Sequence, residues 1–424
     1  MKTIFHSFNL SVMNFKSVLA IIFMVLLFVS SYGQSINKTV IRNTDFAFEL
    51  FKEAFKKDTS ICISPYSISF ALSMTYAGAR NETKAEMSRV LHFDIDQEKS
   101  NYAFGEIQRQ LNLFKGDTSI RLAMANAIWE KDNERVHQEY IDLLHKYYNA
   151  QAYPITNAKA INDWVKLKTN NKIDNIVSEE IVREARVILT NAIYFKGNWL
   201  YEFDKKNTRK DTFSVNGSKR TIVDMMYQKH NFNYYQDEYS QVLEMPYKGN
   251  ELSMMIVLPK PKYSLSELMA NMSAQTFGDY RFGLAEQKVN VFLPKFKFSS
   301  EFELSNELKE MGLIDPFTSS ADFSGIAPKG LYISKVIHET FIEVNEKGSE
   351  AAAVTGVIMI KSVEFQPIEF NANRPFLFFI VAKQTETILF MGSIVNPTEV
   401  NGKDAKVYTG PRTTDGKTPP YNLH

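Results

Sequence analysis

The sequence predicts an α+β fold in which most helices precede most strands. Apolar residues recur at helical spacing through the first half of the 424-residue chain, whereas the second half contains runs of β-branched and aromatic residues. The chain shows no strand–helix–strand alternation and no internal repeat, which argues against a doubly wound or barrel fold. Hydrophobic residues make up 44% of the sequence, enough for a large core.

The expected helices follow one another from Asp45 to residue 169. Asp45 can cap a helix with an apolar face, and Ser64 followed by Pro65 can open a second helix that ends at Gly78. Further helices are expected from residue 82, over 98–114, over 138–148 and over 161–169.

Strands are expected where β-branched and aromatic residues gather. The run RVILTNAIYF at 186–195 predicts a central strand. Other strands are predicted over 120–129, 242–245, 252–258, 288–298, 333–344 and 376–381. After Pro397 the composition changes to Gly, Pro, Thr and Lys with few apolar residues, so residues 398–424 are expected to form a disordered tail.

The N-terminus has the pattern of an export signal. After Lys16, the apolar run VLAIIFMVLLFV is about a dozen residues long, which is short for a membrane span, and small residues follow it. We expect a signal peptide over 1–33, cleavage near Gly33–Gln34 and secretion to an extracellular or periplasmic space, with no membrane contact after cleavage. The alternative is an uncleaved membrane anchor, and Met13 is an alternative start.

Charge, cysteine content and motifs exclude several classes of protein. A net charge of +1 gives no support to nucleic-acid binding. The single cysteine, Cys62, rules out an intramolecular disulfide and multi-thiolate metal sites, and its apolar neighbours indicate a buried side chain. The sequence contains no nucleophile elbow, P-loop, dinucleotide-binding or zinc-protease motif. It therefore predicts no enzyme, no catalytic residue, no metal and no cofactor.

The segment over 346–373 is too long for a hairpin loop and contains an uncharged stretch over 351–360. Gly348 supplies a flexible hinge before it. Read with a period of two, one face of the segment is uncharged and begins with small residues; it consists of Ser349, Ala351, Ala353, Thr355, Val357 and Met359. Such a face could enter a tightly packed sheet as a middle strand. The alternative is a permanently buried strand or an alanine-rich helix.

Several separated motifs between Thr44 and Pro397 make the sequence similar to the serpin family. They are ISPYSISFALSMTYAGARNETKAEM, LTNAIYFKGNW, EMPYKG, FIEVNEKGSEAAAVT, FNANRPFLFFI and FMGSIVNP, in that order. The resemblance implies a single serpin domain over 34–397, with about nine helices, three β-sheets and an exposed reactive loop at about 346–370. It also implies an inhibitor that acts as a suicide substrate: a protease forms an acyl-enzyme with the loop, and the cut loop then inserts into the central sheet.

The resemblance assigns residues to three parts of this mechanism. The loop hinge consists of Glu346, Gly348, Ser349, Glu350, Ala351, Ala352, Ala353, Val354 and Thr355. The breach, where the loop enters the sheet, contains Trp199, Lys295 and Glu346, the last two as an ion pair. The shutter, behind the strands that must part, contains Ser64, Ser67, Asn191 and His338.

Counting from Glu346 places the reactive bond at Ser362–Val363, and a count one residue shorter places it at Lys361–Ser362. A small residue there suits elastase-like proteases and a lysine suits trypsin-like ones; the apolar residues over 358–360 extend the candidates to cysteine proteases. The region over 98–115 lacks a basic cluster, so heparin binding is not predicted, and we expect a monomer. The alternatives are a non-inhibitory serpin that carries a ligand or assists folding, and a hydrolase with an unfamiliar fold.

Overall fold

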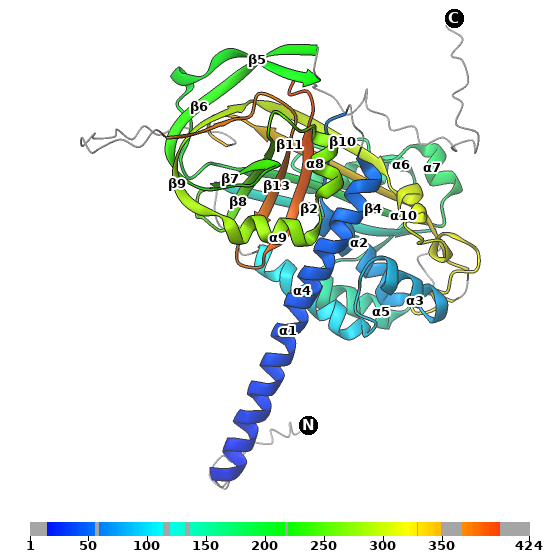
Figure 1. Cartoon of the computed structure of the whole chain (residues 1–424). Helices are drawn as coiled ribbons and strands as arrows, with labels where there is room; N and C mark the ends of the chain where they lie inside the picture. Colours follow the sequence, from blue (N-terminus) through cyan, green and yellow to red (C-terminus); the bar gives the residue numbers. More distant parts are fainter. Residues whose placement is uncertain are drawn as a thin grey trace, which may run out of the picture.

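The computed structural model describes residues 15–55, 59–112, 119–131, 136–216, 219–328, 330–348 and 367–398 (Figure 1). These residues form ten α-helices: α1 (Phe15–Ala54), α2 (Pro65–Gly78), α3 (Asn81–Val90), α4 (Gln97–Asn112), α5 (Gln138–Leu143), α6 (Ala158–Lys168), α7 (Glu179–Glu184), α8 (Leu265–Asn271), α9 (Ala274–Gly283) and α10 (Ser305–Glu310). A π-helical turn at Leu144–Tyr148 extends α5, so the helix predicted over 138–148 is present with a change of geometry.

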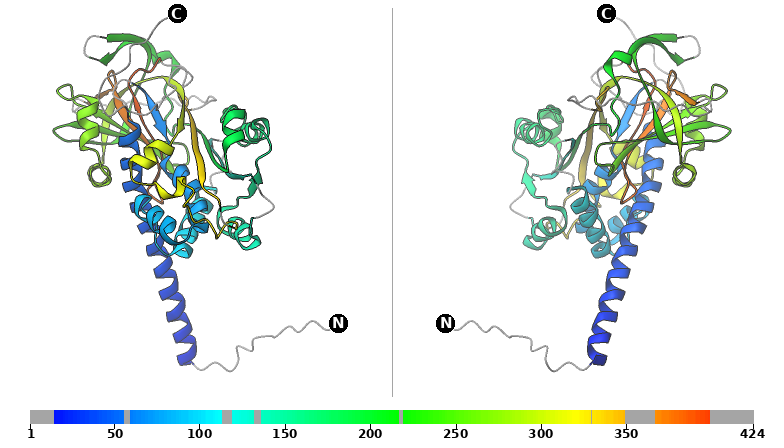
Figure 2. Two further views of the ribbon diagram at one scale, coloured as in Figure 1. Left: turned by 90° about the vertical axis from the view of Figure 1, so that its right-hand side faces the viewer. Right: turned by 90° about the vertical axis from the view of Figure 1, so that its left-hand side faces the viewer.

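Helix α1 differs from the helix predicted to begin at Asp45. It begins at Phe15 and passes through Asp45 without a break, so Asp45 is not its cap. The expected cleavage point at Gly33–Gln34 lies within this helix, and its N-terminal half projects beyond the body of the molecule (Figures 1 and 2). Its C-terminal half buries Phe46 and Phe51 in the core. Within the part of the chain that is described, no helix is long and apolar enough to cross a membrane.

The strands belong to two hydrogen-bonded networks. A five-stranded sheet has the order β10-β11-β4-β2-β3, and the remaining nine strands form the second network. The bounds are β1 (Ile61–Ile63), β2 (Ile120–Glu130), β3 (Ala152–Pro154), β4 (Val187–Gly197), β5 (Arg209–Asn216), β6 (Lys219–Gln236), β7 (Ser240–Pro246), β8 (Leu252–Pro259), β9 (Ala285–Pro294), β10 (Phe296–Glu303), β11 (Ile333–Val344), β12 (Ile368–Asn371), β13 (Phe376–Ala382) and β14 (Thr387–Ile394).

The structure divides one predicted strand and joins two of the expected sheets. The single strand predicted over 288–298 is two strands, because β9 ends at Pro294 and pairs with β6 while β10 starts at Phe296 and pairs with β11. The resemblance implied three sheets, but two of them are joined through the long strand β6. Residues 225–234 of β6 pair with β9, and residues 233–236 continue into a pairing with β7.

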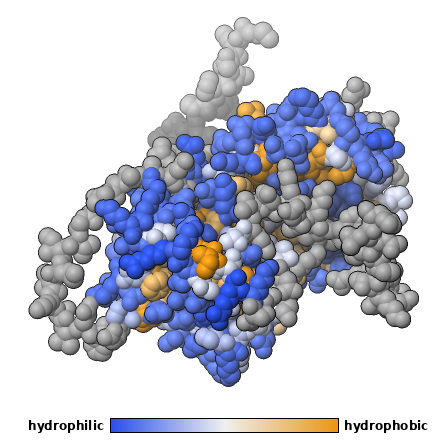
Figure 3. Space-filling model, turned by 90° about the horizontal axis from the view of Figure 1, so that it is seen from above, coloured by the Kyte–Doolittle hydropathy of each residue, from blue (hydrophilic) through white to orange (hydrophobic). Residues whose placement is uncertain are grey.

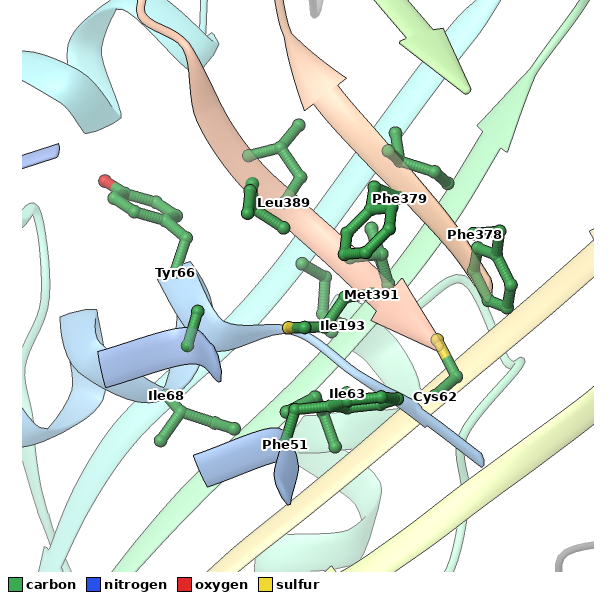
Figure 4. Packing of buried hydrophobic residues seen from close by; sticks show 14 of the residues in the cluster. Phe51, Cys62, Ile63, Tyr66, Ile68, Ile193, Phe378, Phe379, Leu389 and Met391 are labelled. Carbon is green, nitrogen blue, oxygen red and sulfur yellow. The ribbon is translucent and has the colours of Figure 1, made fainter. Parts of the chain in front are cut away.

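The main core lies between the two strand networks and around α2. Ser64 caps α2 through its side chain, Pro65 occupies its first turn, and every residue of the helix is buried. Figure 4 shows Cys62 and Ile63 packed with residues of β13 and β14. The prediction of a buried Cys62 is confirmed, and burial raises the pKa of its thiol to about 12 although a hydrogen bond to Thr340 opposes the rise. The thiol therefore stays protonated and is a poor nucleophile.

A second, smaller core covers the other face of the five-stranded sheet. Alternate residues of β2, such as Ala127 and Trp129, pack against Ile161 and Val165 of α6. Helices α6 and α7 thus lie across the sheet from α2 (Figure 2). Seen from above, the described surface is mainly hydrophilic with small apolar areas, as expected when the apolar side chains fill these two cores (Figure 3).

Candidate functional site between strands β4 and β11

The two central strands of the five-stranded sheet run parallel and pair directly with each other. The pairing extends from Ile333 opposite Val187 to Phe341 opposite Tyr194. Beyond that point β11 continues beside β10 to Val344, and β4 continues beside β2, but the two strands are no longer paired. The seam between β4 and β11 is therefore closed along most of its length and open at one end, where residues 345–348 follow β11.

A buried polar cluster joins the two strands in the middle of this seam. His338 of β11 lies opposite Asn191 of β4, and its Nδ1 hydrogen-bonds to Asn191 Oδ1. On the other side of the ring, the backbone N–H of Ser64 donates to His338 Nε2 over 3.0 Å. The Nδ2 group of Asn191 donates to Ser67 Oγ over 2.6 Å and also to Asn126 Oδ1. The four predicted shutter residues thus form one cluster that spans the seam and the start of α2.

These hydrogen bonds require a neutral histidine. Because Nε2 accepts from Ser64, Nδ1 must carry the proton that it donates to Asn191. Burial lowers the pKa of His338 to about 3, although a hydrogen bond with the Asn191 backbone works in the opposite direction. A proton on Nε2 would place a charge in the core and point it at the Ser64 N–H. The cluster therefore stabilises the closed seam only while His338 is uncharged.

An ion pair lies at the open end of the seam. Lys295 Nζ is 3.1 Å from Glu346 Oε2, and Thr208 Oγ1 donates to Glu346 Oε1 over 2.9 Å. The Glu346 side chain is only 6% exposed. Burial alone would raise the pKa of this carboxyl, but hydrogen bonds from its own backbone, Lys295 and Thr208 together lower it below 4.5. The carboxylate is therefore charged at neutral pH and holds residue 346 beside β10.

Trp199 holds the same segment from the other side. Its indole Nε1 donates to the carbonyl of Asn345 over 3.0 Å, and its backbone N–H donates to the carbonyl of Lys347 over 2.9 Å. The ring is buried and stacks on Tyr247, with ring centroids 4.6 Å apart and an angle of 8° between the planes. Two N–H groups of Trp199 thus attach residues 345–347 to the segment after β4, and stacking on Tyr247 fixes the position of the Trp199 ring.

Gly348 ends the described part of the hinge in a backbone conformation that favours glycine. Its φ angle is +93°, and its N–H closes a turn onto the carbonyl of Asn345 over 3.0 Å. A Cβ atom at this position would lie 2.5 Å from Trp199 N and 2.7 Å from Asn198 Cα, and closer still to the carbonyl oxygen of Gly197. The residue therefore combines a positive φ with a close approach to the backbone at the end of β4.

Replacing Lys295 with methionine is expected to lower the free energy of unfolding by about 1–2 kcal/mol, because the buried Glu346 carboxylate loses its cation. Urea denaturation at pH 7.5 measures this loss, which the double variant K295M/E346Q should largely recover. Lys297→Met is the matched control: its partner Glu343 is 3.6 Å away and 35% exposed, so the expected change is below about 1 kcal/mol. Equal losses in the two methionine variants would contradict a special role for the Lys295 pair.

The site contains two residues that sequence reasoning missed and lacks several that it named. Asn126 bonds Ser67 and Asn191, and Thr208 bonds Glu346; an asparagine in the apolar strand LAMANAIW is the one signal that could have indicated the first. The structure brings together Trp199, Lys295, Glu346 and Gly348 at the end of the seam. Hinge residues Ser349, Glu350, Ala351, Ala352, Ala353, Val354 and Thr355 and the reactive-bond candidates Lys361, Ser362 and Val363 lie outside the described residues and stay predictions.

Comparison with known proteins gives a consistent result over most of the chain. The family model described as "Serpin (serine protease inhibitor)" matches residues 41–397. An uncharacterized serpin-like protein of Methanosarcina mazei is 38% identical over 372 residues, which cover 84% of this chain and 86% of that protein.

Two solved structures are similar in both sequence and fold. Human thyroxine-binding globulin in complex with thyroxine has a TM-score of 0.79 and 28% identity, and the match covers 86% of this chain and 100% of that one. The thermophilic serpin tengpin in its native state has a TM-score of 0.76 and 32% identity, with 84% and 94% covered. Together with the family match and the α+β architecture, these similarities show that the chain belongs to the serpin family.

Proposed function

We propose that this serpin is exported and inhibits serine proteases by inserting its cut reactive loop between β4 and β11. The observation that carries the proposal is the seam itself. Its two strands are parallel and directly paired, and their pairing stops at the end where residues 345–348 leave β11 and contact residues 197–199 after β4. A segment that continues from Gly348 can enter at that end and run antiparallel to both strands.

The covalent step needs no catalytic group from the serpin. The serine hydroxyl of the protease attacks the carbonyl carbon of the residue before the reactive bond, Ser362 or Lys361. The peptide C–N bond breaks, the new amino terminus leaves with a proton from the protease histidine, and an ester joins the loop to the protease. Insertion of the loop then moves the ester-linked protease along the sheet before water can release it.

The energy for this movement comes from the strand that forms. An inserted segment gains hydrogen-bond ladders to both β4 and β11, and each cross-strand side-chain pair adds about 0.2–1 kcal/mol. Over about a dozen residues these terms exceed the cost of parting the shutter cluster, whose individual hydrogen bonds contribute about 1 kcal/mol each. The intact loop is connected to the fold at both ends, which makes its insertion slow. Cleavage frees one end and allows insertion to proceed rapidly.

The test is covalent trapping. The purified protein is mixed separately with trypsin and with elastase, and the mixtures are denatured in SDS. The proposal expects a band of summed mass that resists SDS, with the released peptide beginning at Val363 for elastase or Ser362 for trypsin. Cleavage of the loop across a protease panel without a covalent band would refute the inhibitory mechanism. Sequencing the N-terminus of the exported protein tests the cleavage expected near Gly33–Gln34.

Replacing Ser349 with arginine is expected to convert the inhibitor into a substrate. Ser349 is the first hinge residue after Gly348, and insertion would bury its side chain within the sheet, where an unpaired charge is strongly unfavourable. The ratio of cleaved to trapped serpin should rise at least about tenfold, which corresponds to 1.4 kcal/mol in the partition between insertion and hydrolysis. Glu350→Arg is the matched control, because the period-two pattern places residue 350 on the opposite face. Unchanged trapping by the S349R variant would show that residue 349 stays outside the sheet.

A non-inhibitory carrier is the second candidate, and the similarity to thyroxine-binding globulin favours it. The hinge argues for inhibition, because Ser349 and three consecutive alanines are small and uncharged, whereas a carrier has no need of an insertable loop. Thermal unfolding after loop cleavage separates the two candidates. A large rise in the unfolding temperature indicates insertion, and an unchanged temperature indicates a loop that stays outside.

A further inference from the structure

The hairpin formed by β5 and the first half of β6 lies beside both ends of the reactive loop. Just before β5, Thr208 donates to the Glu346 carboxylate over 2.9 Å, and within β5 the backbone N–H of Ser214 donates to the carbonyl of Asn373 over 2.8 Å. Glu346 and Asn373 flank the segment that contains the predicted reactive bond. The hairpin lies at the end of the molecule opposite the projecting half of α1 (Figures 1 and 2). A protease that binds the loop must therefore approach next to this hairpin.

The segment over 204–224, which contains the hairpin, is basic. It has six Lys and Arg residues and three Asp residues, which leaves a net charge of +3, whereas the whole chain has +1. Lys210 is neutralised, because its Nζ is 2.9 Å from Asp224 Oδ1. Arg209 and Arg220 are exposed, and neither forms an ion pair with another residue that the structure describes. Two uncompensated guanidinium groups are therefore presented to solvent beside the reactive loop.

The outer face of the hairpin offers an apolar contact next to these charges. Phe213 and Val223 are buried, so the residues that alternate with them lie on the outer face. Arg220 and Ile222 are on this face, and Ile222 is 58% exposed. An apolar side chain beside an arginine suits a protein partner, whose interfaces combine apolar and ionic contacts. A polyanionic chain would leave the isoleucine without a contact, so the face favours a protein.

We propose that this hairpin is a second contact surface for the target protease and selects proteases that are acidic beside the active-site cleft. Complementary charge acts before the loop reaches the active site, because an attractive field raises the rate of encounter by about tenfold or more. The reactive residue then selects by side chain, and the hairpin selects by surface charge. This inference rests on the proposed function, since it describes the protease that the loop meets.

Cleavage of the loop by two forms of trypsin tests the proposal. The anionic and cationic isozymes both cleave after lysine but differ in net charge. Each is mixed with the full chain in about 20 mM salt, and the second-order rate constant is measured from the fragment that begins at Ser362. The free peptide over 356–366 is the reference for each isozyme, because it contains the bond but not the hairpin. Relative to this peptide, the anionic isozyme should cleave the full chain about tenfold faster than the cationic one, and about 0.5 M salt should remove most of the difference.

Two double variants locate the charge that is responsible. R209A/R220A should reduce the preference for the anionic isozyme to about threefold or less, because it removes both uncompensated guanidinium groups. K166A/R183A is the matched control. It also removes two exposed positive charges, but from α6 and α7, which lie away from the hairpin in Figures 1 and 2. This variant should keep the preference of the parent.

Three results would overturn the proposal. The parent could show no preference at low salt, or R209A/R220A could keep the full preference. The third is acceleration of the cationic isozyme by a heparin oligosaccharide, lost in R209A/R220A, which would identify a polyanion as the partner of this surface. The fragment that begins at Ser362 forms whether or not the protease is trapped. The expected preference without a covalent band would therefore support the surface while refuting the proposed inhibitory function.

Discussion

Replacing Gly348 with alanine is expected to destabilise the uncleaved protein by about 2–5 kcal/mol. A non-glycine residue at φ +93° costs about 1–2 kcal/mol, and forcing a Cβ atom into the backbone of residues 197–199 adds about 1–3 kcal/mol. The strain belongs to the turn at 345–348. After insertion the same residue would lie in an extended strand, where alanine is ordinary, so the loop-cleaved form should lose less than about 1 kcal/mol.

Gly330→Ala separates the two contributions. Gly330 also has a positive φ, +108°, but a Cβ atom there would meet no atom within 4 Å. The G330A variant should therefore lose only the conformational part, about 1–2 kcal/mol, and should lose it equally before and after cleavage. Urea denaturation of the intact and cleaved forms of both variants measures the four values. A G348A penalty that is equal in the two forms would mean that the 345–348 turn survives cleavage, contrary to insertion at this point.

The G348A variant is expected to lose more stability in the intact form than in the loop-cleaved form, and this difference has a functional consequence. Strain that exists only before insertion lowers the barrier to leaving the native state, so the variant should insert its uncut loop on standing. Incubation at 37 °C should therefore abolish trapping of the target protease faster in G348A than in the parent or in G330A. The glycine is thus expected to maintain a state that is not the most stable one available to the chain.

The spacing of apolar residues along the sequence predicted strands well where both faces of a sheet are covered, or where apolar and polar residues alternate strictly. The strand expected over 333–344 has the same bounds as β11, because its apolar residues Val336, Ile342 and Val344 recur at even positions that face the main core. Strand β6 was missed because many of its alternate residues are exposed or half-buried and polar. The division at Pro294 was missed because nothing local shows that the residues before it pair with β6 and those after it with β11.

The site depends on contacts that local pattern does not contain. Asn191 and His338 are 147 positions apart, and Lys295 and Glu346 are 51 apart, so their pairing was available only through the resemblance to a family. Thr208 and Asn126 show the limit of that route. Each forms a hydrogen bond with a residue that the resemblance did name. Thr208, for example, is the second side-chain donor to Glu346, and a buried carboxylate requires such a donor. The sequence alone does not show that Glu346 is buried.

Acidification is expected to weaken the closed seam through His338. The pKa of this histidine is about 3 in the folded protein and 6.5 without perturbation, so the unfolded chain binds the proton more tightly. The stabilising contribution is therefore fully present above pH 6.5 and is lost as the pH falls toward 3. Between pH 6.5 and pH 4 it should decrease by about 3 kcal/mol, close to the limit of 1.4 kcal/mol per pH unit for one group.

The His338→Gln variant should lack this part of the pH dependence. Glutamine gains no proton in this range, so the variant is expected to be less stable than the parent at pH 7.5, where it loses the bonds to Ser64 and Asn191, but to change less on acidification. His137→Gln is the control, because His137 is exposed and its replacement should leave the profile unchanged. Urea midpoints at several pH values provide the comparison. Parallel profiles for parent and H338Q would show that some other group causes the acid sensitivity. A difference between the slopes of the two profiles that is confined to the range below pH 6.5 would place the proton on His338, within the cluster that joins β4 to β11.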